Sequence, residues 1–263
     1  MTGLIIGFGE VGRAHFENLK EVYSGDLFYK DKGPEIYNSK GEVVESCPRN
    51  AILMIATQCD PNNIEPFVDM VVGYYTKYSP FIIDILTTCP VNTCEAIAEH
   101  THIDIVCRSS TRGMHPNLAK FLIDIPKHIG GPQAEILKEY YEAAGWTCYT
   151  HEKARTVELQ HIMNNIIYGA NIMIWDEICK IARHYAVDIH ELIKYRETNN
   201  SGFIKAGYPS KVSPILYPLN NAPLGGHCIV YSATCIPDSI KGPIMGLLAT
   251  FNKGKGSIKS NVN

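Results

Sequence analysis

Residues Gly7-Phe8-Gly9-Glu10-Val11-Gly12 decide the fold of the N-terminal half of this 263-residue chain. The apolar run Leu4-Ile5-Ile6 precedes them and the stretch from Arg13 to Leu19 follows, which predicts a strand, a tight turn and a helix. Glycines at the first, third and sixth positions permit the bend, a close approach of a pyrophosphate, and close packing of helix on strand. The phosphates would lie on the unpaired N–H groups of the new helix. The stretch therefore predicts a dinucleotide-binding turn.

The second apolar run indicates which dinucleotide is bound. Leu27-Phe28-Tyr29 leads into Lys30-Asp31-Lys32, and Asp31 lies about 20 residues beyond the last glycine, where an acid meets the adenosine ribose hydroxyls. An acid there repels a 2′-phosphate and favours NAD over NADP, and Lys32 tempers that preference without reversing it. These features favour an NAD site over the alternative, a glycine-rich turn that binds nothing.

Composition excludes several classes of function. The chain is 45% hydrophobic and 19% charged, as in ordinary soluble globular proteins, and its formal net charge of -3 argues against nucleic acid or an anionic membrane as a partner. The N-terminus predicts a strand rather than a signal peptide, and no apolar run approaches the ~20 residues of a bilayer span. The nine cysteines show neither CxxC nor structural-zinc spacing. We therefore expect a cytoplasmic protein with reduced cysteines and no metal.

Alternating strands and helices predict an α/β fold over residues 1–152, a Rossmann-type doubly wound parallel sheet. Ligands bind at the carboxyl ends of such strands. Polar residues follow the strands there, namely Asp31, Thr57, Thr87-Thr88, and the segment from Arg112 through His115 to Asn117. The further elements that we expect are a reduced third strand near 42–44, helices over about 60–77, 92–100 and 133–144, and strands over 51–56, 81–85, 103–106 and 146–149.

A second, all-helical domain is predicted over residues 153–252. From Ala154 to Tyr185 there is no proline and only one glycine, Gly169, which indicates one long helix. That helix is apolar on much of its circumference, so we expect it to be widely buried and to build a homodimer. A shorter helix over Asp188–Arg196, a long loop over 199–223 and a disordered tail over 253–263 complete this prediction.

Two groups of residues suggest chemistry. Glu158, His161 and Asn165 share one face of the long helix. His161 could serve as general base, because an unperturbed imidazole has a pKa of about 6.5, with Asn165 orienting a substrate hydroxyl; the alternative is a buried polar network. Cys228, beside His227, is either a nucleophile or a buried structural cysteine. Gly225-Gly226, just before this pair, allow close backbone approach.

The chain resembles the UDP-glucose/GDP-mannose 6-dehydrogenase family over roughly residues 1–235. The matching pieces are the glycine turn, Thr87-Thr88 with Pro90 and Thr93, Glu158-Leu159 with Asn165, Asp176-Glu177, and Gly225-Gly226-His227-Cys228-Ile229. The resemblance implies a small-molecule substrate, a sugar nucleotide whose alcohol is oxidised twice with two NAD. It also implies that Cys228 captures the aldehyde as a thiohemiacetal, Thr88 positions water and Asn165 orients the substrate.

Departures from this family leave other functions open. His161 replaces the family's lysine, Asn117 its glutamate and Ser232 its aspartate, and the chain stops where the third, nucleotide-gripping domain begins, which implies a short form. Gly113-Met114-His115-Pro116 is similar to a segment of prephenate dehydrogenases, which implies a one-step prephenate or β-hydroxyacid dehydrogenase using His115 or His161. A catalytically altered NAD-binding regulatory protein is the third alternative. We expect Arg112, His115, Asn117, Glu158 and Gly225–His227 to contact substrate.

Overall fold

The computed structural model describes residues 1–45, 49–102, 104–113, 117–216, 224 and 227–251, and every statement below concerns these residues. The chain forms two compact units, Met1–Ile162 and Met163–Asn263. The division falls inside the long helix α6 (Ala154–His184), whereas the sequence prediction places it just before that helix. The predicted tail over 253–263 lies outside the described residues.

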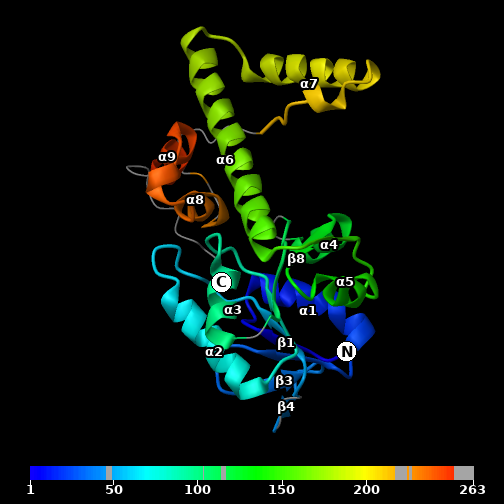
Figure 1. The fold of residues 1–263 in the computed structure, drawn as a ribbon. Coiled ribbons are helices and arrows are strands. Elements are labelled where there is room, and N and C mark those ends of the chain that lie inside the picture. The colour runs from blue at the N-terminus through cyan, green and yellow to red at the C-terminus, as the bar shows by residue number, and fades with distance from the viewer. Residues whose placement is uncertain (46–48, 103, 114–116, 217–223, 225–226, 252–263) are drawn as a thin grey trace. The chain divides into compact units, whose positions relative to one another are not determined.

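The first unit is built on a nine-stranded sheet in the order β4-β3-β2-β1-β5-β6-β7-β8-β9. Figure 1 labels β1, β3, β4 and β8 of this sheet. From β2 across to β7 neighbouring strands are parallel, β2, β3 and β4 form an antiparallel meander, and β8 is antiparallel to β7 but parallel to β9. This confirms the doubly wound α/β fold. The strands are β1 (Gly3–Ile6), β2 (Leu27–Lys30), β3 (Ile36–Asn38), β4 (Val43–Val44), β5 (Ile52–Ile55), β6 (Ile82–Ile85), β7 (Val106–Ser109), β8 (Lys127–Gly130) and β9 (Cys148–His151).

Three features of this sheet differ from prediction. The prediction placed a strand over 103–106, but β7 begins only at Val106 and carries the buried polar residues Arg108 and Ser109. The antiparallel strand β8 and the strand β3 were not anticipated. In β7 and β8 polar residues occupy strand positions because their partners come from distant segments, as for Arg108 and Lys127. The three-residue strand β3 ends at Asn38, which bonds locally to Glu42, and is too short for an apolar pattern to reveal it.

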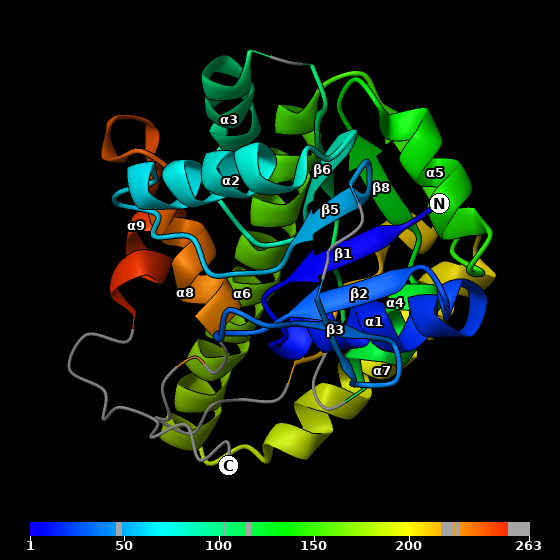
Figure 2. The same ribbon diagram turned by 90° about the horizontal axis from the view of Figure 1, so that it is seen from below.

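Helices cover both faces of the sheet (Figure 2). One apolar core packs α1, α4 and α5 on one face, and a second packs α2, α3 and the first turn of α6 on the other. Alternate strand residues supply the two cores, as in β1, where Ile5 enters the first core and Leu4 and Ile6 the second. The helices are α1 (Glu10–Tyr23), α2 (Glu65–Tyr78), α3 (Thr93–Thr101), α4 (Leu118–Asp124) and α5 (Ala134–Glu142).

The second unit is helical, as predicted. Its described elements after α6 are α7 (Ile189–Lys205), η1 (Pro209–Lys211), α8 (His227–Thr234), η2 (Asp238–Ile240) and α9 (Pro243–Thr250). The long helix is confirmed, but α7 continues to Lys205, so the loop predicted from Asn199 is wrong over its first part, and 217–223 lie outside the described residues. None of the described helices combines the length and apolarity needed to cross a bilayer.

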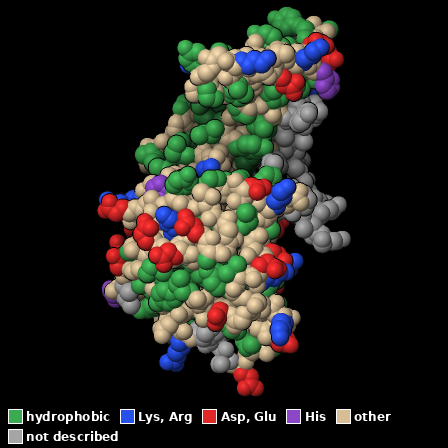
Figure 3. Space-filling model, turned by 90° about the vertical axis from the view of Figure 1, so that its right-hand side faces the viewer, with side chains coloured by type: hydrophobic (Ala, Val, Ile, Leu, Met, Phe, Trp, Pro, Cys, Tyr) green, Lys and Arg blue, Asp and Glu red, His purple; other side chains and the backbone are tan. Residues whose placement is uncertain are grey.

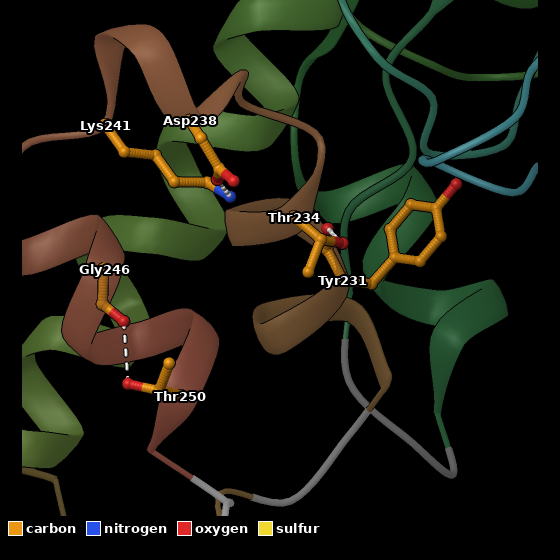
Figure 4. Close-up of polar contacts among 6 residues, drawn as sticks. All are labelled: Tyr231, Thr234, Asp238, Lys241, Gly246 and Thr250. Atoms are coloured by element: carbon orange, nitrogen blue, oxygen red, sulfur yellow. Dashed lines mark hydrogen bonds and ion pairs between the residues drawn. The ribbon is translucent and has the colours of Figure 1, made fainter.

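Close packing in the second unit centres on Gly169. A Cβ atom at this position would lie 2.4 Å from Ile229 of α8 and 2.9 Å from Leu248 of α9. The glycine therefore lets both helices approach α6. Figure 4 shows the polar contacts that support the α8–α9 region, where Lys241 pairs with Asp238 at 2.7 Å, Thr234 donates to the Tyr231 carbonyl at 2.7 Å, and Thr250 donates to the Gly246 carbonyl at 2.9 Å.

We predict losses of stability of very different size for two glycine substitutions in the turn after β1. In Gly12→Ala the new Cβ would lie 2.0 Å from the Gly7 carbonyl oxygen, so we expect a loss of about 3 kcal/mol in the free energy of unfolding. Gly9→Ala is the matched control, because nothing lies within 4 Å of its Cβ, and it should cost less than about 1 kcal/mol. Urea unfolding followed by circular dichroism measures both; equal losses would contradict the packing role of Gly12.

Candidate active site

The turn after β1 has the geometry of a dinucleotide site. Gly7 has a φ of +90°, which favours glycine, and a Cβ there would collide with the Ala56–Thr57 backbone. Gly9 is the N-cap of α1, is exposed, and has open space where a Cβ would be, so a phosphate can approach its backbone. The start of α1 then offers unpaired N–H groups and the positive end of the helix dipole. The three predicted glycine roles therefore fit the observed turn.

Further predicted cofactor residues lie at the same rim as this turn. Asp31 and Lys32 directly follow β2 and are exposed at the same rim. Phe8 stacks on Tyr29 of β2, with ring centroids 3.8 Å apart, which braces the turn. Arg13, which the sequence reading missed, donates from Nε to the Phe8 carbonyl oxygen at 2.8 Å. Its position in the first turn of α1 places a guanidinium beside the predicted pyrophosphate site.

The carboxyl ends of β5 and β6 supply three threonines. Thr57 follows β5, and Thr87 and Thr88 follow β6; all three are half-buried. Thr88 Oγ1 lies 2.9 Å from His161 Nε2, and this hydrogen bond joins the sheet rim to the second turn of α6. The sequence singled out both residues but gave no sign that they touch.

His161 is buried and neutral at physiological pH. Burial is the main cause that lowers its pKa to about 3, and the charges of Arg108 and Arg112 lower it further. This pKa differs from the ordinary value near 6.5 on which the expectation of a general base rested, and the general-base role stays a prediction. The neutral ring is a hydrogen-bond partner of Thr88.

Glu158 connects α6 to α3 through hydrogen bonds on both of its carboxylate oxygens. Its carboxylate accepts N–H hydrogen bonds from Asn92 at 2.7 Å and from Cys94 at 2.9 Å, at the N-terminus of α3. The side chain is 1% exposed, and burial raises its pKa despite these two hydrogen bonds. Both oxygens are therefore engaged within the protein, and a contact of Glu158 with substrate stays a prediction.

The second unit carries the remaining predicted catalytic residues. Asn165 Nδ2 donates to Ser232 Oγ at 2.9 Å, from α6 to α8, and Ser232 is completely buried. Cys228 lies four residues before Ser232, on the same face of α8 and in its first turn. Among the cysteines of the described chain it is the only exposed one. Helix α8 thus presents a thiol one turn from the Asn165–Ser232 pair.

The other predicted substrate residues are only partly described. Arg112 is half-buried beyond β7, and Asn117 is exposed at the start of α4. His115, Gly225, Gly226 and the side chain of His227 lie outside the described part of the structure. In the described ranges no group of three His, Cys, Asp or Glu residues is arranged to hold a metal ion.

Comparisons with known proteins agree with this architecture. No protein-family model matches the chain, and no curated protein matches it in sequence. Among solved structures, a UDP-D-ManNAc dehydrogenase from Pyrococcus horikoshii is 16% identical with a TM-score of 0.68, covering 97% of this chain and 70% of that one. The UDP-N-acetyl-mannosamine dehydrogenase from Staphylococcus aureus is 14% identical with a TM-score of 0.69, covering 97% and 68%.

A shorter enzyme matches over nearly its whole length. The 3-hydroxyisobutyrate dehydrogenase from Mycobacterium tuberculosis, in complex with L-serine, is 13% identical with a TM-score of 0.65, covering 97% of this chain and 95% of that one. At identities this low, the TM-scores show a shared fold alone. They confirm the Rossmann-type sheet followed by helices, and at the level of fold they agree with the resemblance to sugar-nucleotide dehydrogenases.

The burial of His161 predicts that its imidazole takes up a proton only at acidic pH. Its folded-state pKa of about 3 lies below the ordinary value near 6.5, so the neutral ring's contribution to stability is complete above pH 6.5 and is lost as pH falls toward 3. NMR of the imidazole Cε1–H group, assigned with His161→Gln, should show a neutral ring down to pH 4.5. The urea-unfolded chain is the control, because there the His161 ring should titrate near the ordinary value of about 6.5. A midpoint near 6.5 in the folded protein would contradict the described burial.

Proposed function

We propose that this chain is an NAD-dependent dehydrogenase that oxidises an alcohol carbon of a polar small molecule. The observation that carries the proposal is the Thr88–His161 hydrogen bond at the same sheet rim as the dinucleotide turn. The glycine turn and the α1 N-terminus would hold the pyrophosphate and Asp31 the adenosine ribose. When bound, NAD supplies the hydride acceptor.

The protein's own contribution is to hold the hydroxyl and guide its proton. If neutral His161 accepts the hydrogen bond of Thr88 through Nε2, the Thr88 oxygen can accept the proton of a substrate hydroxyl. A hydroxyl becomes strongly acidic as its carbon loses hydride, so a weakly basic pair suffices to take up the proton. Burial of His161 also keeps water from competing for this hydrogen bond.

One candidate is a four-electron oxidation of a sugar nucleotide. It is favoured by Cys228, exposed in the first turn of α8 one turn from the Asn165–Ser232 pair. The thiolate would add to the aldehyde carbon of the first product, forming a C–S bond while the carbonyl oxygen takes a proton. A second NAD would accept the hydride of this thiohemiacetal, and water would cleave the thioester to the acid and the thiol.

The second candidate is a one-step oxidation of a β-hydroxyacid. It is favoured by the Thr88–His161 pair, which needs no nucleophilic cysteine. In this case Cys228 has no chemical role and the reaction stops at the carbonyl product. A regulatory NAD-binding protein would keep the glycine turn and show no turnover at all.

We predict that Cys228→Ser separates these candidates. The chain should be assayed with NAD against UDP-sugars, GDP-mannose, prephenate and small hydroxyacids, with NADH counted per substrate consumed and products identified by mass spectrometry. For the four-electron reaction the wild type forms two NADH per substrate, and Cys228→Ser forms one and releases aldehyde.

Cys179→Ser, a buried cysteine of the same unit, is the control and should leave the stoichiometry at two. Acid formation by Cys228→Ser would exclude the nucleophile. One NADH per substrate in both proteins would establish the one-step reaction, and NAD binding without turnover of any compound would favour the regulatory protein.

We also propose a homodimer formed through α6. Ile167, Ile174 and Ile181 recur every seven residues, and each is more than half exposed within one copy. Figure 3 shows hydrophobic side chains gathered along the part of the molecule that α6 forms. A seven-residue apolar stripe suits a second helix of the same kind, so a second copy is the occupant that we propose.

Ile174→Glu should therefore convert the dimer to a monomer, because it buries a charge in the proposed interface. Light scattering at micromolar concentration measures the mass. Val22→Glu, the same change at an exposed apolar position of the first unit, is the matched control and should remain dimeric. A monomeric wild type would refute the dimer.

A further inference from the structure

The two residues before Arg112 are held at the sheet rim by hydrogen bonds to the neighbouring strands. Thr111 Oγ1 donates to the Leu86 carbonyl at the end of β6, at 3.1 Å. On the other side, Ser110 N–H donates to the His128 carbonyl at 2.8 Å, and His128 N–H donates to Ser110 Oγ at 2.8 Å. The backbone just before Arg112 is therefore anchored to β8 through Ser110 and to the end of β6 through Thr111. Thr88 follows that same end of β6.

A pair of imidazoles lies at the same rim. His128 Nδ1 and His151 Nε2 are 2.9 Å apart across β8 and β9, and their rings stack with centroids 5.2 Å apart. Both rings are half-buried rather than enclosed. The Arg112 charge is felt both by His128, where it helps burial and His151 to lower the pKa, and by His161. The Arg112 charge therefore contributes to lowering the pKa of one imidazole on the sheet and one on α6.

No carboxylate forms an ion pair with the positive charge at this rim. Within the described ranges neither Arg112 nor Arg108 has a carboxylate within salt-bridge distance. Arg108 is completely buried; its Nη1 reaches the Ile85 and Ser109 carbonyls, while Nε and Nη2 have no hydrogen-bond partner among the described residues. The nearby acid Glu158 is already engaged by α3, and Asp84, which feels the Arg108 charge, feels Lys127 more strongly and accepts a hydrogen bond from Tyr141. Two guanidinium groups without ion-pair partners create a local field that favours an anion.

This field is distinct from the predicted pyrophosphate site. In the sheet order, β5 and β6 separate β1 from β7. Neighbouring strands are about 4.8 Å apart, so the rim at β7 lies about 14 Å from the turn at Gly9. An anion at Arg112 therefore belongs to a different group from the cofactor's pyrophosphate, and it lies on the side of Thr88 and His161.

We propose that Arg112, with the imidazoles of His128 and His151, binds an oxyanion of the substrate, a carboxylate or a phosphate group. The buried Arg108 would add long-range attraction, and Arg112 a charge-assisted hydrogen bond. As a statement about substrate, this rests on the proposed dehydrogenase function and names the anionic group that its substrate carries. The same anion would offset the Arg112 charge and raise the pKa of His161, making its ring a better proton acceptor when substrate is bound.

The test measures anion binding on the full chain without NAD. Malonate and methyl phosphate are titrated separately while the imidazole NMR signals of His128 and His161 are followed, so the two arms distinguish a carboxylate from a phosphate. We expect a saturable shift with at least one probe, a dissociation constant at least about tenfold weaker in Arg112→Gln, and partial recovery in Arg112→Lys. Arg155→Gln is the control, because this exposed arginine pairs with Glu95 at 3.1 Å in the same unit.

Each outcome decides for or against the site. Saturable binding that depends on Arg112 and raises the pKa of His161 supports it, even if no compound is turned over and the dehydrogenase proposal fails. Absence of a saturable shift, or equal affinity in wild type, Arg112→Gln and Arg155→Gln, overturns it. If the enzyme is active and Arg112→Gln keeps the wild-type KM for its substrate, the claim about substrate class is overturned while the dehydrogenase function stands.

Discussion

The buried carboxylate of Glu158 is the constraint on which the candidate site depends. It holds the first turns of α6 against the N-terminus of α3, where two N–H groups and the helix dipole compensate its charge. Gly130 lets α6 approach the sheet at the same place, because a Cβ there would lie 2.5 Å from the Lys153 carbonyl oxygen. His161, three residues after Glu158, is thereby carried to Thr88. The acid positions the site without joining its chemistry.

The two faces of the sheet differ in whether their buried charged side chains have partners. On the α1 face, Tyr141 donates to Asp84 at 2.6 Å and Lys127 donates to His15 Nε2 at 3.0 Å, and burial lowers the pKa of Lys127 to about 8. That network offsets its own charges beneath α1. On the α6 face Arg108 has no acid partner in the described chain. This asymmetry makes the rim near β7 attractive to an anion while the α1 face serves structure.

Much of the fold could be predicted from local sequence patterns. The glycine turn, the apolar strands β1, β5 and β6 and the helix α6 were predicted because their signals lie within a few neighbouring residues. The strands β7 and β8 were misplaced or missed because polar side chains in them contact segments far along the chain, whereas β3 is too short to give an apolar pattern. Arg108 escaped notice because its partner carbonyl at Ile85 lies in another strand. Arg13 was missed although its partner, the Phe8 carbonyl, is only five residues away.

By itself the sequence determined the Rossmann-type fold, the dinucleotide turn with Asp31 and the long helix bearing Glu158, His161 and Asn165. Only the tertiary structure decided what those three residues do, since their spacing puts them on one face and says nothing about their partners. Burial against α3 makes Glu158 a structural acid, and burial near Arg108 and Arg112 makes His161 a neutral ring. Protonation depends on the solvent and charges within a few ångströms, which a chain acquires only when distant segments meet.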